Sequence, residues 1–235
     1  MDIKKAFAYS LKSSIPIFIS FLPVGLAYGI VMRSAGYSWV WSGLCSLTVF
    51  AGSLQFLMVS FLQEGTSLLT VTVTALLLNS RHIFYGIPFI ETWKNYGPRK
   101  LFLIYALPDE AFSLHCANDF EDGSSRDKML TYVFSAALIL LYWVVLSMLG
   151  GLVGAVLPFN TEGIDFALTA LFIVITLEQL RDPVNRLPAL MAVASAAVCL
   201  LVLGPDSFLL PSLTVTVVLL YIIRDRHAEE GEGTK

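Results

Sequence analysis

The sequence has few charged residues and lacks the usual motifs of an enzyme. Charged side chains make up 14% of the 235 residues, whereas about 25% is typical of soluble domains. The three cysteines, Cys45, Cys116 and Cys199, lie far apart in apolar stretches, and no pair has the spacing of metal ligands. No HExxH zinc motif, P-loop or basic patch for nucleic acid occurs. These absences predict a protein that is not an enzyme and holds no metal or cofactor.

The sequence instead contains many long hydrophobic runs. Hydrophobic residues make up 56% of the chain, and its mean hydropathy is +0.73. Runs long enough to cross a bilayer recur along the sequence. Backbone polar groups in lipid must be paired within their own segment, so the spans should be helices. We therefore predict an all-α, polytopic membrane helix bundle.

Eight apolar stretches are candidate transmembrane helices: 14–32, 39–62, 67–90, 101–117, 129–157, 164–180, 187–203 and 208–223. The fourth is short and carries Pro, Asp, Glu and His, so it either crosses the membrane or only dips into it, which would leave seven crossings. Residues 1–223 then form a single transmembrane domain. The charged tail, residues 224–235, has the composition of a disordered segment.

The distribution of Lys and Arg predicts a cytoplasmic N-terminus. With eight crossings, ten basic residues outside the spans fall on the N-terminal side and four on the other. The segment "ETWKNYGPRK" is the exception, since this arrangement places Lys94, Arg99 and Lys100 on the side that is usually poor in positive charge. The chain is expected to be a multi-pass membrane protein in this orientation.

Small residues suggest an internal repeat. Gly25 and Gly29 in the first helix have the same spacing as Gly150 and Gly154 in the fifth. Three helices, a connector and three more helices would form a 3+3 inverted repeat with broken helices, which is a common transporter plan.

The first polar cluster is "PVGLAYG". Pro23 removes a backbone donor and tends to kink a helix. Gly25 and Gly29 lie on one face and allow close helix approach. The cluster is either a kinked packing face or a kink that opens a cavity.

The second polar cluster, "FAGSLQF", interrupts the run from Trp39 to Leu62. Gly52 and Ser53 weaken helix propensity, and Gln55 costs free energy in hydrocarbon unless it is paired. One interpretation is that Gln55 joins helices by a hydrogen bond. The other is a discontinuous helix in which Ser53 and Gln55, with Phe56 beside them, line a polar pocket at the midplane.

The third cluster is "NSRHIFYG". An intramembrane Arg next to a His is costly and should face a cavity or a partner. Asn79 and His82 are three residues apart and Arg81 and Tyr85 are four apart, so the pairs lie on adjoining stripes of one helix. A helix-end anchor at the interface would use Arg and Tyr in the same way.

The fourth cluster, "PDEAFSLH", places Asp109 and Glu110 directly after Pro108. Acids are favoured in the first turn of a helix, so both could serve as a cap at the interface. Alternatively, one acid pairs with Arg81 and the other titrates or meets a substrate ammonium group.

Together these clusters give the order "G…FAGSLQF…NSRHIFYG…DEAFSL…GIDFALTALF", which resembles the AzlC-like branched-chain amino acid permeases. The resemblance runs from Pro16 to about residue 220, and "FAGS-Q-F" and "N-RH-YG" carry most of it. Ser80 stands where the family pattern has Leu, and Pro108 stands where it has Thr, which puts the local role of Asp109 and Glu110 in question.

The resemblance implies a bacterial inner (plasma) membrane exporter of Val, Leu, Ile and possibly Met that works with a small AzlD-type membrane subunit. A zwitterionic aliphatic substrate needs hydrogen-bond donors, acceptors and an apolar pocket. From the chemistry of the clusters we expect its contacts from Gly52, Ser53, Gln55, Phe56, Asn79, Arg81, His82 and Tyr85. Asp109 and Glu110 are expected as proton-coupling or ion-pair residues. The small residues Ser147, Gly151 and Ala155 could form the docking face for the subunit, or they could pack within the chain. The rival functions are an ion or small-solute channel and a non-transporting membrane scaffold.

Overall fold

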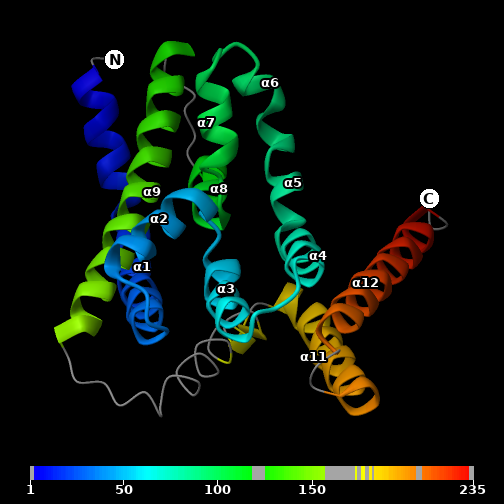
Figure 1. The fold of residues 1–235 in the computed structure, drawn as a ribbon. Coiled ribbons are helices and arrows are strands. Elements are labelled where there is room, and N and C mark those ends of the chain that lie inside the picture. The colour runs from blue at the N-terminus through cyan, green and yellow to red at the C-terminus, as the bar shows by residue number, and fades with distance from the viewer. Residues whose placement is uncertain are drawn as a thin grey trace. The chain divides into compact units, whose positions relative to one another are not determined.

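The computed structural model describes residues 3–117, 125–156, 173, 176–177, 180–181, 183–204 and 208–232. Within this part of the chain all regular structure is helical, which confirms the predicted all-α class (Figure 1). The helices are α1 (Ile3–Ser34), α2 (Trp39–Val49), α3 (Gly52–Glu64), α4 (Leu68–Asn79), α5 (Arg81–Tyr85), η1 (Ile87–Phe89), α6 (Ile90–Trp93), α7 (Arg99–Tyr105), α8 (Asp109–Ala117), α9 (Ser125–Val156), α11 (Pro183–Leu203) and α12 (Leu209–Glu232). The sixth predicted helix, 164–180, lies mostly outside the described residues.

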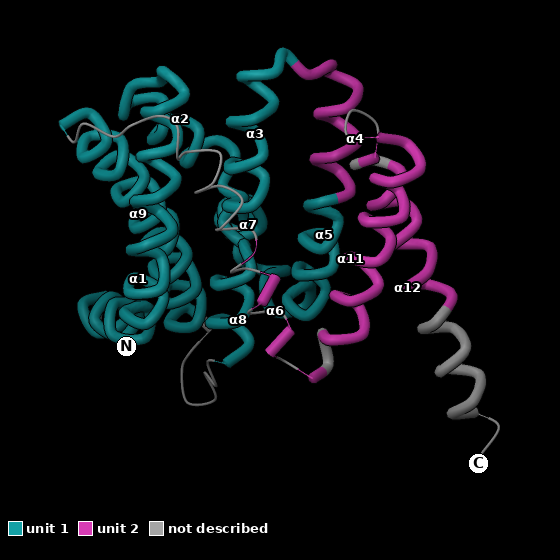
Figure 2. The backbone as a smooth tube through the Cα atoms, turned by 90° about the horizontal axis from the view of Figure 1, so that it is seen from below, with its two compact units in different colours: residues 1–65, 78–164 teal, residues 66–77, 165–235 magenta. Residues whose placement is uncertain are grey.

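The chain divides into two compact units (Figure 2). Unit 1 contains residues 1–65 and 78–164, and unit 2 contains residues 66–77 and 165–235. In unit 2, α11 and α12 pack against each other. Helix α12 continues to Glu232, so helical structure reaches into the tail that the sequence predicts to be disordered. All four polar clusters belong to unit 1.

Three described helices are long and apolar enough to cross a membrane: Ile3–Ser34, Arg126–Val156 and Arg186–Leu203. The second, third and fourth predicted spans are instead broken into shorter helices. The longest piece of these, α3, has 13 residues, or about 20 Å at 1.5 Å per residue, which is less than the 30 Å hydrocarbon layer. Hydropathy therefore locates these segments correctly but misses their interruptions.

Helices α1 and α9 pack side by side and run parallel. The Ser10 hydroxyl donates to the Thr131 carbonyl at 3.1 Å, and the backbone of Gly29 lies against that of Gly150 and Gly151. Residue numbers thus rise together along both helices. If both span the membrane, the chain must cross it an odd number of times between them.

The chain between α1 and α9 begins with a pair of short helices that turns back on itself. Helix α2 runs antiparallel to α9. Trp39, at the start of α2, lies against Gly151, whereas Ser46, near its end, is hydrogen-bonded to Ser147, which is nearer the start of α9. The helix ends at Val49, and α3 then leads back toward the end of unit 1 at which α1 stops (Figure 1). We call α2 and α3 the first re-entrant pair.

A second re-entrant pair is formed by α7 and α8. The chain is non-helical from Ala106 to Pro108, between the two helices. Helix α8 then runs beside α5, η1 and α6 in the same direction, since Phe112 packs near Phe89 and His115 near Trp93. The fourth predicted helix thus dips into unit 1 and returns, as one of the two alternatives from the sequence proposed.

The turn between α6 and α7 lies at the end of unit 1 where α1 and α9 begin. Tyr96 in this turn packs against Tyr132 in the N-terminal part of α9, with ring centroids 6.4 Å apart. Figure 1 shows the turn at the same end as the N-terminus. The sequence prediction that placed Lys94, Arg99 and Lys100 on the opposite side is therefore wrong, because the second predicted helix does not cross but turns back.

The parallel course of α1 and α9 also bears on the predicted repeat. Helices related by a two-fold axis in the membrane plane run in opposite directions. Since α1 and α9 run in the same direction, their packing does not support the 3+3 inverted repeat that pairs the first helix with the fifth.

Candidate functional site

The tips of the two re-entrant pairs meet inside unit 1. Phe50, in the first break, packs against Tyr105 at the end of α7, with ring centroids 6.4 Å apart. The Tyr105 hydroxyl donates to the Leu47 carbonyl, one of the carbonyl groups that the end of α2 leaves without an intrahelical partner. The helix break predicted at "FAGSLQF" is confirmed at Phe50 and Ala51, directly before Gly52.

Both breaks expose helix ends to the same region. Helices α3 and α8 begin at the tips, so their first turns present free N–H groups and the positive end of each helix dipole there. Helix α2 ends at a tip and presents carbonyl groups that lack intrahelical partners, of which the Leu47 carbonyl accepts from Tyr105. Broken helices of this kind hold charged groups of substrates in several transporter folds.

Four side chains beside the second tip form the charged cluster: Arg81, His82, Tyr85 and Asp109. Arg81 Nη1 lies 2.8 Å from Asp109 Oδ2, and the Tyr85 hydroxyl donates to Asp109 Oδ1 at 2.9 Å. His82 Nε2 lies 3.7 Å from the same Oδ1. The prediction that one acid of "PDE" pairs with Arg81 is confirmed, and that acid is Asp109.

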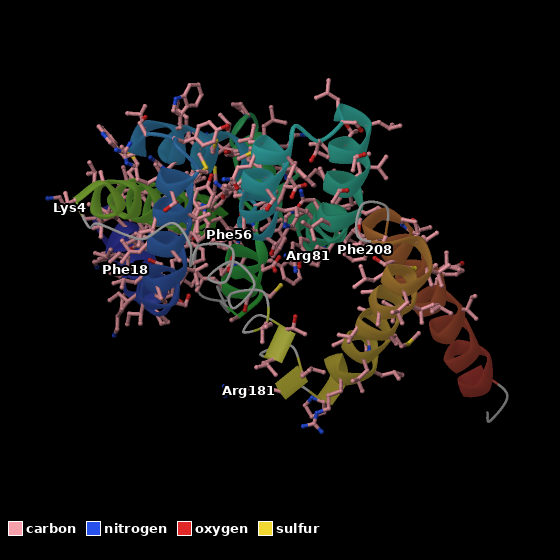
Figure 3. All side chains as sticks on the ribbon, turned by 60° about the horizontal axis from the view of Figure 1, so that its bottom comes forward. Lys4, Phe18, Phe56, Arg81, Arg181 and Phe208 are labelled. Carbon is pink, nitrogen blue, oxygen red and sulfur yellow. The ribbon has the colours of Figure 1, made fainter. Side chains whose placement is uncertain are left out.

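The charged cluster is paired but accessible. The side chains of Arg81 and Asp109 are 46% and 40% exposed, so neither is sealed in the protein interior. Asp109 is the first residue of α8, where the helix dipole also favours its negative charge. The cluster offers cationic donors and a carboxylate acceptor within one small region, as Figure 3, which labels Arg81, helps to locate.

Glu110 stands next to the charged cluster without a cationic partner. Among the described residues, no Lys, Arg or His side chain lies within ion-pair distance of its carboxylate. The side chain is half-buried in the first turn of α8. Of the two predicted acids, only Asp109 has an ion-pair partner among the described residues, and the role of Glu110 in proton coupling or ammonium binding stays a prediction.

Gln55 is fully buried in a set of hydrogen bonds that we call the tip network: Ser46, Gln55, Trp143 and Ser147. Trp143 Nε1 donates to Gln55 Oε1 at 2.6 Å. Gln55 Nε2 donates to Ser46 Oγ at 3.1 Å, and Ser46 Oγ donates to Ser147 Oγ at 2.8 Å. In this conformation Gln55 joins α3 to α2 and α9, as the first of the two interpretations of "FAGSLQF" expects. Its contact with a substrate stays a prediction.

The other predicted residues near the first tip differ in exposure. Phe56 is 1% exposed and packs edge-on against Tyr28, so it belongs to the core (Figure 3). Gly52 and Ser53 are half-buried in the first turn of α3. Asn79 is half-buried at the last residue of α4. Substrate contacts of these four residues stay predictions.

Gly25 and Gly29 serve close packing between α1 and α9. A Cβ atom at Gly25 would lie 2.8 Å from Leu146 Cβ, and one at Gly29 would overlap the backbone of Ser147 and Gly151. Helix α1 continues through Pro23 without interruption. The packing interpretation of "PVGLAYG" is confirmed for the two glycines, while the kink at Pro23 stays a prediction.

The face proposed for docking the small subunit is largely used within the chain. Ser147 is fully buried in the tip network. Gly151 is buried against Trp39 of α2, whose Cα would lie 2.8 Å from an added Cβ. Only Ala155 of this stripe is exposed. The docking role of Ser147 and Gly151 is thus wrong, and the alternative of intrachain packing is correct.

Sequence reasoning missed Trp143 and Tyr105, which hold the two tips in place. Trp143 lies in the apolar run of α9 and looks like an ordinary core residue, although a buried indole N–H needs an acceptor. Tyr105 precedes a Pro by three residues, and this position before a helix break was the available signal. Among the described residues, no group of His, Cys, Asp and Glu has the arrangement of a metal site.

Comparison with known proteins decides the family. The profile described as AzlC protein matches residues 16–157. The branched-chain amino acid transport protein AzlC of Bacillus subtilis is 35% identical over 95% of this chain and 87% of its own length. The chain belongs to the AzlC family.

Other relatives of this AzlC family member are also membrane proteins. An uncharacterized membrane protein of Helicobacter pylori strain J99 is 33% identical over 95% of this chain and 97% of its own length. The inner membrane protein YgaZ of Escherichia coli K12 is 28% identical over 71% of this chain and 70% of its own length. No solved structure matches the chain significantly.

Proposed function

We propose that this protein exports branched-chain amino acids (Val, Leu, Ile and possibly Met) by gradient-driven, alternating-access transport. The observation that carries the proposal is the charged cluster, which is paired yet exposed and lies where two helix breaks meet, in a chain of the AzlC family. The printed name of the Bacillus relative supports the substrate class. A family name alone would not say which residues act.

The geometry suits a zwitterion. Arg81 and the free N–H groups at the start of α3 and α8 can bind a carboxylate. Glu110 and the carbonyls at the end of α2 can accept hydrogen bonds from an ammonium group. A substrate carboxylate would compete with Asp109 for Arg81, so binding would exchange one ion pair for another rather than leave a charge unpaired.

Proton coupling is assigned to Glu110, with Asp109 and His82 as its nearest titratable neighbours. A carboxyl group that lacks a cationic partner can gain and lose a proton without breaking an ion pair. Among the described residues no P-loop occurs, so an electrochemical gradient is the expected source of energy.

The arrangement of unit 1 also supports a cytoplasmic N-terminus. Eight basic residues lie at the end where α1 and α9 begin: Lys4, Lys5, Lys12, Lys94, Arg99, Lys100, Arg126 and Lys128. Among the described residues of unit 1, Arg33 lies at the opposite end, beside Gly154. Positive charge concentrates on the cytoplasmic side of membrane proteins. We place the protein in the bacterial inner membrane in this orientation.

A small AzlD-type subunit is proposed as the partner, since the family resemblance implies one. Its docking face must lie outside the Ser147–Gly151 stripe, which α2 covers. Valine transport in cells that lack the small subunit would show that the subunit is not required.

The test is efflux of radiolabelled valine from cells that express the protein with and without the small subunit. Efflux above that of control cells is expected with the subunit present. Equal retention of valine in all cells would contradict transport, and would favour the rival scaffold function. Against that rival, a scaffold would be expected to bury its ionic pairs within the protein, whereas the Arg81–Asp109 pair is partly exposed at the protein surface.

A further inference from the structure

An open cavity of about 660 Å³ lies at the surface of unit 1, between α5–α6 on one side and α7 on the other. Its volume falls in the range of small-molecule pockets, about 300–1,000 Å³. Its walls are mainly apolar. The aromatic rings of Phe89 and Trp93 form part of the lining, and aliphatic side chains come from both sides: Ile83, Ile87, Ile90, Ile104 and Leu107. The tip network does not line it.

The two ends of the cavity differ in chemistry. One end reaches His82, a member of the charged cluster, and Leu107, which lies in the break before α8. The other end is lined by Glu91, Lys94 and Lys100, around the turn that lies beside the N-terminal part of α9. The cavity thus connects the charged cluster to the basic end of unit 1.

We propose that this cavity is the vestibule through which the amino acid reaches the charged cluster from the cytoplasm, and that its isoleucine wall selects the aliphatic side chain. The proposal rests on the proposed function. Lys94, whose ammonium lies 3.5 Å from the Glu91 carboxylate, and Lys100 keep the mouth polar, and the aliphatic wall receives the side chain of the substrate. The inner end then presents the zwitterionic group to Arg81 and Asp109.

The chemistry of the end near His82 favours an amino acid over a lipid as the occupant of the cavity. An acyl chain that filled the cavity would place hydrocarbon against His82 and the ion pair behind it, which removes water from polar groups without replacing its hydrogen bonds. A zwitterionic amino acid has polar groups at one end and a short aliphatic group at the other. It therefore matches both parts of the cavity.

Gly86 provides the means to test the cavity without disturbing the fold. It lines the cavity, and a Cβ atom built on it would meet no other atom within 4 Å. Its φ of −73° and ψ of −21° are helical, so any side chain is tolerated by the backbone. A larger residue at this position would grow into the cavity.

The first experiment compares valine and leucine efflux of the wild type, Gly86→Ala and Gly86→Phe. Gly86→Phe is expected to lower valine efflux at least tenfold, and Gly86→Ala to lower leucine efflux more than valine efflux. Leu141→Phe, on the exposed face of α9, is the matched control and should transport normally. Wild-type efflux by a well-folded Gly86→Phe protein would overturn the proposal.

The second experiment does not require transport. Gly86→Cys, in a variant whose three native cysteines are replaced by alanine, is treated with a membrane-impermeant, charged thiol reagent from each side of the membrane. Reaction from the cytoplasmic side, slowed by valine, is expected. Reaction with a lipid-soluble reagent alone would indicate a lipid-filled groove and overturn the proposal, as would reaction that valine does not slow.

These results separate the vestibule from the transport function. If the wild type moves no valine, the proposed function fails, and reaction at position 86 still decides whether the cavity opens to the cytoplasm. If the wild type transports valine but position 86 is sealed from cytoplasmic reagent, only the vestibule is refuted.

Discussion

At the scale of single residues, Gln55 and Arg81 have different roles although both are polar residues in apolar runs. Gln55 is fully buried, and both of its polar atoms are hydrogen-bonded to protein groups. Among the described residues Arg81 is ion-paired with Asp109, and its side chain remains 46% exposed. A buried, paired amide stabilises a fold, whereas an exposed ion pair can exchange partners with a ligand.

Gln55→Leu should destabilise the protein. The substitution leaves Trp143 Nε1 without its acceptor in a buried position, and an unpaired buried donor costs about 1–3 kcal/mol. We expect a lower thermal midpoint of the purified protein in detergent. Gln63→Leu, at an exposed position of the same helix, is the control. Equal midpoints for the two variants would mean that the tip network does not hold the first tip.

Glu110→Gln should uncouple export from pH. If Glu110 carries the coupled proton, the glutamine amide that replaces its carboxyl group cannot take up that proton. Efflux from vesicles should then lose its dependence on the pH gradient, while valine still binds. The Glu64→Gln variant, at the far end of α3, should keep that dependence. Full pH-dependent export by Glu110→Gln would remove Glu110 from the mechanism.

At the scale of helices, some features could be predicted from the sequence and others could not. The small residues Gly25 and Gly29 indicate close helix approach by their spacing alone. Pro108 indicates a boundary in the fourth segment. The reversal after Val49 is different, because a run of apolar residues has the same hydropathy whether it crosses a membrane or turns back. The partner of Gln55 lies 88 residues away in the sequence, beyond any local pattern.

Gly29→Ala should weaken the packing of α1 against α9. An added Cβ would overlap the backbone of α9, and overpacking of this kind costs about 1–3 kcal/mol or more. The measurement is again the thermal midpoint in detergent. Gly86→Ala, where the added atom meets nothing within 4 Å, should keep or raise the midpoint. A stable Gly29→Ala variant would show that the two helices do not approach this closely.

At the scale of the whole molecule, the two re-entrant pairs reconcile the charge distribution with the topology. The three basic residues of the α6–α7 segment lie at the end of unit 1 that also holds the starts of α1 and α9. The sequence alone places them on the other side because each apolar run is counted as one crossing. When a re-entrant pair is counted as a crossing, every loop that follows it is assigned to the wrong side of the membrane, until a second such miscount restores the assignment.

Thiol labelling tests this topology. Asn95→Cys, in the α6–α7 turn, should react with an impermeant reagent from the same side of the membrane as Lys5→Cys near the N-terminus. Tyr37→Cys, in the turn between α1 and α2, should react from the opposite side. Labelling of positions 5 and 95 from opposite sides would refute the re-entrant course of α2 and α3.

The central claim is that the charged cluster binds a branched-chain amino acid, and valine counterflow in proteoliposomes tests it most directly. Arg81→Ala should weaken the apparent valine affinity at least tenfold, because the carboxylate loses its cationic partner, whereas Arg33→Ala at the far end of α1 should not. The two proteins should elute alike in size-exclusion chromatography. Unchanged valine affinity in Arg81→Ala would contradict the account.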